Sequence, residues 1–205
     1  MENIFNLFVR SIFIDNMIFA YFLGMCSYLA VSKTVKTSFG LGIAVIFVLV
    51  ITAPINWLID TYVLKSGALK WINDSFADVD LSYLSFIIFI AVIAGIVQLV
   101  EMVVEVFTPA LYISLGIFLP LIAVNCAILG AALFIQEREY STITEVIAYS
   151  LGSGIGWMLA IVSIAAIREK IKYSLIPAPL KGIGITYILT GLMAIAFMSF
   201  MGIKI

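Results

Sequence analysis

Residues 37–59 read TSFGLGIAVIFVLVITAPINWLI, a run of 23 residues without a single Asp, Glu, Lys or Arg. A helix needs about 20 apolar residues to cross the hydrocarbon core of a bilayer. The run is apolar on every side, whereas a strand of a membrane β-barrel alternates between apolar and polar residues. It therefore predicts a transmembrane α-helix.

Five other runs also lack charged residues, and with 37–59 they predict six spans. They cover residues 16–32, 81–100, 106–136, 146–167 and 182–203. The run 106–136 has 31 residues and contains Pro120. As one helix it would be about 46 Å long, well beyond a hydrocarbon core of about 30 Å. We therefore expect helix 4 to be broken, and Gly24 is the matching weak point in helix 1.

The composition agrees with a single membrane domain over residues 1–205. Apolar residues make up 64% of the chain and charged residues 11%, against about 45–50% and about 25% in soluble domains. Eleven Lys and Arg face twelve Asp and Glu, for a net charge of −1, so the chain lacks the basic field of a nucleic-acid binder. A soluble enzyme and a disordered chain are excluded by the same numbers.

The distribution of basic residues predicts the orientation. The loops between spans 1 and 2 and between spans 5 and 6 lie on the same side of the membrane. They hold six of the eleven basic residues, which are Lys33, Lys36, Arg168, Lys170, Lys172 and Lys181. The positive-inside rule places these loops in the cytoplasm and both termini outside.

A short motif occurs twice and indicates an internal repeat. Residues 38–43 read SFGLGI and residues 150–155 read SLGSGI, each at or near the start of a span. We expect two repeats of three helices, 1–105 and 106–205. Three is odd, so the repeats would be inverted in the membrane, an arrangement that places functional sites near the midplane. The alternative is chance similarity between helices whose glycines serve close packing.

The chain has two cysteines, one in each repeat. Cys26 lies in span 1 and Cys126 in span 4, ahead of the glycine motif in both cases. A lone membrane cysteine is usually an inert small hydrophobe, but this paired placement favours a ligand role. An iron–sulfur centre takes four protein ligands, and the chain has no histidine. A thiolate metal site would therefore need two ligands from another chain.

Six stretches carry a resemblance to a known family. They are FLGMC (22–26), VSKTVKTSFGLGIAV (31–45), GIFLPLIAVNCAILG (116–130), SGIGWMLAIV (153–162), IREKIKYS (167–174) and GITYILTGLMAIAFMSF (184–200). They are similar to the Nqr/Rnf family of bacterial membrane subunits, nearly end to end. The fourth and fifth stretches favour the Nqr form, and the A subunit of the Rnf complex is the near relative.

The resemblance implies a fold and an activity. The fold is all-α, with six transmembrane helices in two inverted three-helix repeats and with helices 1 and 4 broken. Cys26 and Cys126 match the ligand positions of a [2Fe-2S] centre that is completed by two cysteines of the homologous D subunit. The complex, which also contains A, B, C and F subunits, lies in the bacterial inner membrane. It passes electrons from NADH to quinone and exports Na⁺.

Polar residues close to the cysteines and within the spans are further candidates. Gly24 and Asn125 flank the two cysteines and would surround the centre, although an interhelical packing role for Asn125 fits as well.

Gln98, Glu101 and Glu105 fall at i, i+3 and i+7, so they share one helix face. Carboxylates within a membrane commonly mark ion paths, so this face is a candidate Na⁺ path, and Asp15 is a second one. The alternatives are interfacial snorkelling of the helix end, and pairing of Arg10 with Asp15.

Three other functions stay open. One is an Rnf-type electron-transport subunit, one is an iron-free inverted-repeat transporter, and one is a structural protein that only anchors a complex. Iron content that depends on the cysteines separates an electron carrier from the last two.

Overall fold

The computed structural model describes residues 4–64, 84–107, 122–175, 177, 180 and 182–202, and every regular element in them is a helix. The α-helices are α1 (Ile4–Phe13), α2 (Met25–Val31), α3 (Val35–Ile59), α4 (Ser85–Phe107), α7 (Cys126–Glu137), α8 (Ile143–Ile171) and α9 (Ile183–Met198). A π-helix, η1 (Asp60–Leu64), extends α3, and a 3₁₀-helix, η6 (Ser199–Gly202), follows α9. The expected all-helical class is confirmed for this part of the chain.

Three of the expected spans are helices long and apolar enough to cross a membrane. They are Val35–Leu64, Ser85–Val103 and Ile143–Ile171, and they correspond to the charge-free runs 37–59, 81–100 and 146–167. The run 182–203 begins as expected with α9. This helix has 16 residues, about 24 Å at 1.5 Å per residue, so by itself it is shorter than the core of a bilayer.

The first span is broken, as expected, but the break is longer than a weak point at Gly24, and the helical parts extend beyond the predicted run 16–32. Its helical part upstream, α1, ends at Phe13, and no α-helix forms in 14–24 before α2 begins at Met25. The side chain of Asn16 accepts hydrogen bonds from the backbone N–H groups of Ile18 and Phe19, and such local bonds compete with helix formation. The break is thus a segment of eleven residues. Pro120 and the first part of the run 106–136 lie outside the described residues.

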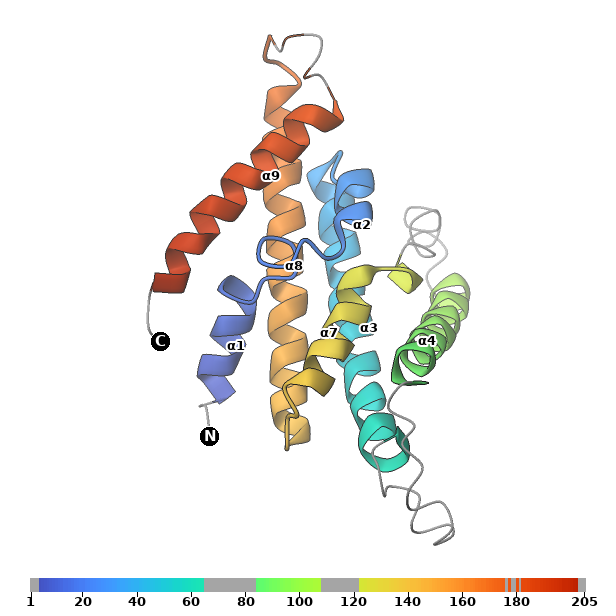
Figure 1. The fold of residues 1–205 in the computed structure, drawn as a ribbon. Helices are drawn as coiled ribbons and strands as arrows, with labels where there is room; N and C mark the ends of the chain where they lie inside the picture. Colours follow the sequence, from blue (N-terminus) through green and yellow to red (C-terminus); the bar gives the residue numbers. More distant parts are fainter. Residues whose placement is uncertain are drawn as a thin grey trace, which may run out of the picture.

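Two long helices, α3 and α8, cross the middle of the structure in opposite directions (Figure 1). They approach closely at two glycines. A Cβ on Gly42 would collide with Met158, and a Cβ on Gly154 would lie 2.9 Å from Cγ1 of Ile46. Ile46 follows Gly42 by four residues, and Met158 follows Gly154 by four. The two contacts are therefore equivalent, as in a pair of helices related by a two-fold axis.

The serines of the repeated motif are equivalent in the same way. Ser38 and Ser150 are both fully buried. Ser38 Oγ donates to the carbonyl of Thr34, and Ser150 Oγ donates to the carbonyl of Val146, in each case four residues back. The motifs in 38–43 and 150–155 therefore adopt the same local structure.

Helix α1 packs against a second glycine face of α8. A Cβ on Gly152 would lie 2.8 Å from the carbonyl oxygen of Phe8, and one on Gly156 would lie 2.7 Å from that of Ile12. Asn16 Nδ2 donates to the carbonyl of Gly156 at 2.9 Å, which fastens the non-helical segment 14–24 to the same helix. Helices α4 and α9 lie at the outside and expose many apolar side chains, as expected of surfaces that face lipid or another protein.

Candidate functional site: two cysteines at adjacent helix starts

Helices α2 and α7, which carry the cysteines, begin beside each other and run in opposite directions from that point (Figure 1). Gly24 precedes α2, and Asn125 caps α7 by accepting a hydrogen bond from the N–H of Ala127 at 3.1 Å. A Cβ on Gly24 would lie 2.8 Å from Oδ1 of Asn125 and 3.0 Å from Cβ of Ala127. The two helix starts are therefore in direct contact, through residues that the sequence singled out.

Gly24 is required at this position for two reasons. Its backbone has φ of 80°, in the left-handed region, which glycine adopts at little cost. In addition, a Cβ would lie 2.7 Å from Nε1 of Trp157, which is fully buried on α8. Gly24 is thus enclosed between the start of α7 and the middle of α8.

The two thiols are free and exposed. Cys26 is the second residue of α2 and Cys126 is the first residue of α7. Cys126 lines a shallow groove with Ile90 and Ile93 of α4. Within the described residues, no three His, Cys, Asp or Glu side chains come together to hold a metal ion. The described residues by themselves therefore do not complete a metal centre on these thiols.

Two buried N–H donors on residues that approach Gly24 have no hydrogen-bond partner among the described residues. They are Nδ2 of Asn125 and Nε1 of Trp157, on residues that are 2% and 0% exposed. The sequence places Asn125 near the centre. It does not single out Trp157 as a site residue, because its spacing only marks it as a buried residue of an apolar helix.

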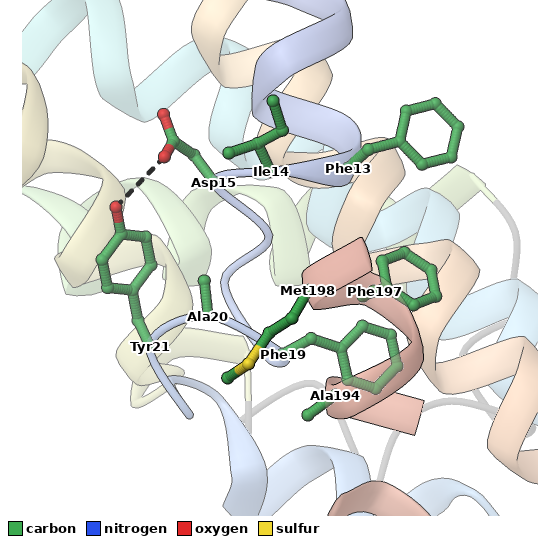
Figure 2. Close-up of a pocket in the computed structure, with 9 residues that line it drawn as sticks. All are labelled: Phe13, Ile14, Asp15, Phe19, Ala20, Tyr21, Ala194, Phe197 and Met198. Carbon is green, nitrogen blue, oxygen red and sulfur yellow. Dashed lines mark hydrogen bonds between the residues drawn. The ribbon is translucent and has the colours of Figure 1, made fainter. Parts of the chain in front are cut away.

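Asp15 is buried and ion-paired. Its Oδ2 lies 2.8 Å from Nη1 of Arg138 and 3.4 Å from Nε of Arg10, and the hydroxyl of Tyr21 donates to its Oδ1 at 3.3 Å (Figure 2). Of the alternatives for Arg10, the structure shows the pair with Asp15, whereas sequence reasoning missed Arg138. A cation that bound at Asp15 would have to compete with two guanidinium groups.

Arg138 follows α7 and joins it to the segment 14–24. Burial disfavours its charged form, but hydrogen bonds with Asp15 and Tyr140 outweigh this and raise the pKa of Arg138 above its already high value. The guanidinium therefore stays charged at all accessible pH values. Its carbon also lies 5.3 Å from the ring centre of Tyr149 on α8, so one side chain connects three parts of the fold.

A half-open pocket lies next to Asp15 (Figure 2). Its walls are apolar and come from the segment 13–21 and from the end of α9, including Phe19, Phe197 and Met198. Asp15 and Tyr21 supply its polar groups, and they are hydrogen-bonded to each other. The pocket thus offers an apolar surface, with its acidic group already satisfied.

The expected sodium face lies on α4. Gln98 and Glu105 are exposed, and Glu101 is partly buried. Glu101 continues the buried row of Ser85, Phe89, Ile93 and Val97 at intervals of four residues. Neither glutamate forms a salt bridge with a described residue. The structure keeps the three residues on one helix, α4, whereas Asp15 lies on the segment after α1.

These features define an all-helical membrane protein in which two short helices start together, each with an exposed cysteine. The chain belongs to the Rnf-Nqr family of membrane subunits, whose family model, described as "Rnf-Nqr subunit, membrane protein", matches residues 4–204. The resemblance seen in the sequence is thereby confirmed.

Several relatives are similar to the chain over its full length and their own. The proteins named as the E subunit of Na(+)-translocating NADH-quinone reductase are 59% identical over 205 residues in Psychromonas ingrahamii and 58% identical over 205 residues in Actinobacillus pleuropneumoniae. The protein of that name from Rhodopirellula baltica is 54% identical over 213 residues. The Nqr form, favoured by the sequence, agrees with these relatives.

Proposed function

We propose that this chain is the E subunit of a Na⁺-translocating NADH:quinone reductase and that it carries electrons across the membrane through an iron–sulfur centre. Cys26 and Cys126 would hold one side of a [2Fe-2S] centre, and two cysteines of a homologous D subunit would hold the other. The observation that carries this proposal is the contact between the two cysteine-bearing helix starts, with both thiols exposed.

The donor set fits such a centre. Thiolates are the usual ligands of iron–sulfur clusters, and the thiols lie on the surface, where a second protein can reach them. When bound, the centre supplies one-electron transfer. The chain itself supports the thiols on two helix starts, and its apolar core, which contains Tyr28 and Trp157, excludes water behind them.

The same contacts support two inverted repeats, 1–105 and 106–205. In this arrangement α3 and α8 are equivalent, and the paired contacts of Gly42 with Met158 and of Gly154 with Ile46 are what a two-fold axis between them requires. Because the two helices run in opposite directions, this axis is perpendicular to them and lies in the membrane plane. The cysteine-bearing helix starts would then lie near the middle of the bilayer.

Sodium would pass along the face of α4 that carries Gln98, Glu101 and Glu105. Glu101 is the preferred residue on this face, because it continues a buried row and forms no salt bridge with a described residue. Asp15 would take part only if its pairs with Arg10 and Arg138 open. The other partners would be the A, B, C and F subunits, in a bacterial inner membrane, with both termini on the external side.

The deciding experiment replaces the two thiols. In the purified complex, Cys26→Ser and Cys126→Ser should each abolish the iron that depends on this chain, together with quinone reduction, because serine is a poor ligand for iron–sulfur clusters. Gly95→Ala on α4, where a Cβ meets nothing within 4 Å, is the control and should keep both. If the double serine variant retains its iron and its activity, the chain is a transporter or a structural protein instead.

A further inference from the structure

We propose that the indole N–H of Trp157 and the side-chain amide of Asn125 raise the reduction potential of the centre held at Cys26 and Cys126. Neither residue would bind the metal. Both would stabilise the negative charge that the centre gains when it is reduced. The inference rests on the proposed function and adds a residue, Trp157, that the sequence does not single out as part of the site.

The first observation is that both groups are buried donors for which the described part of the chain supplies no acceptor. Trp157 is 0% exposed and Asn125 is 2% exposed, yet Nε1 of the first and Nδ2 of the second donate to none of the residues that the structure describes. An unsatisfied buried donor costs about 1–3 kcal/mol, so proteins satisfy nearly all of them. Two such donors at one place leave N–H dipoles that no described residue neutralises.

The second observation is where these donors lie. Nε1 of Trp157 and the amide of Asn125 both approach Gly24, the residue before α2, and Asn125 is the residue before Cys126. The Oδ1 atom of Asn125 accepts the N–H of Ala127, whereas its Nδ2 group donates to no described residue. The donors are thus next to the chain segments that carry both cysteines.

The other described tryptophan, Trp57, differs from Trp157 in having an acceptor for its indole N–H. Nε1 of Trp57, at the end of α3, donates to the carbonyl of Tyr140 at 2.9 Å. Trp157 is more deeply buried, so it has the greater need of an acceptor. Its ring packs in the core without one, although Gly24 and Asn125 are close by.

Electrostatics gives the direction of the effect. Reduction adds one negative charge to the centre, and in a low-dielectric interior nearby N–H dipoles stabilise that charge strongly. Hydrogen bonds and dipoles around the sulfur atoms are among the factors that set iron–sulfur potentials. Removing either donor should therefore disfavour the reduced state and lower the potential.

The test is a redox titration of the purified complex, followed by the electron paramagnetic resonance signal of the centre. Trp157→Phe keeps an aromatic ring and removes the N–H together with part of the indole, and the control Trp57→Phe loses the same atoms. Asn125→Ser keeps an oxygen that can cap α7 and removes the amide. Both variants should retain iron and show a several-fold lower ratio of reduced to oxidised centre at a fixed poise, where a tenfold change corresponds to about 59 mV for one electron.

The matched control is Trp57→Phe, the same substitution at a tryptophan whose N–H has its own acceptor. Its potential should equal that of the unaltered complex. If Trp157→Phe or Asn125→Ser keeps its iron and its centre has the same reduction potential as in the control, the inference is wrong. Loss of iron from both variants also overturns it, since the residues would then only support the fold. Absence of iron from the unaltered complex would instead refute the proposed function.

Discussion

Replacing Gly24 by alanine tests the contact between the two helix starts. The change adds one methyl group at a residue with φ of 80°, where a residue with a Cβ pays about 1–2 kcal/mol. The new Cβ would lie 2.7 Å from Nε1 of Trp157 and 2.8 Å from Oδ1 of Asn125. Both neighbours are buried, and overpacking of this kind costs about 1–3 kcal/mol.

The two costs together predict a loss of about 2–5 kcal/mol, a large part of the about 5–15 kcal/mol that stabilises a typical folded protein. Relief of the overlap would also move the start of α2 away from α7, and with it Cys26. Gly24→Ala should therefore lower the midpoint of thermal unfolding of the purified complex and reduce the iron bound per complex.

The control for this experiment is Gly191→Ala. Gly191 lies within α9, and a Cβ there meets nothing within 4 Å. Alanine is the better helix former by about 1 kcal/mol, so this variant should be as stable as the unaltered protein or more so. If Gly24→Ala matches Gly191→Ala in both unfolding and iron content, the close contact between the two helix starts does not exist in the protein.

Two more predictions concern charged residues. Arg138→Gln leaves Asp15 with Arg10 as its one ion-pair partner among the described residues. The variant should destabilise the complex by about 2–3 kcal/mol, somewhat less than the about 3–5 kcal/mol that is lost when a fully buried pair is broken. Adding Asp15→Asn should recover part of this in a denaturation experiment, and no recovery would mean that the pair is not the cause. Glu101→Ala should raise the Na⁺ concentration needed for half-maximal quinone reduction several-fold, whereas Glu105→Ala, at an exposed position, should change it less. An unaltered sodium response in both would leave the face of α4 with an interfacial role only.

The sequence predicts those features of the fold that depend on composition. Charge-free runs of 20–23 residues correspond to α3, α4 and α8, because length and apolarity alone decide whether a helix can span a bilayer. The prediction for the first span is wrong in its bounds, because Arg10 and Asp15 interrupt the apolar run in the sequence. In the structure their charges compensate each other, and Arg138 contributes as well.

The candidate site was predictable in part for a related reason. Cys26, Cys126, Gly24 and Asn125 stand out because they are rare or lie next to a rare residue. Trp157 lies far from Cys126 in the sequence, and only the packing of Gly24 against α8 brings it to the site. Long-range contacts of this kind depend on how helices pack, which local patterns do not encode.

The paired contacts between α3 and α8 also have a consequence for the history and assembly of the chain. In a symmetric homodimer, each contact between two residues occurs twice, because the same two positions also meet with the subunits exchanged. Here both partners are parts of one polypeptide, as if two copies of a three-helix protein, inserted in opposite directions, had been fused. In each half, the glycine of the long helix packs against a side chain of the other half, Gly42 against Met158 and Gly154 against Ile46. Fragments divided between α4 and α7 should therefore be unstable when produced separately and should complement each other when produced together.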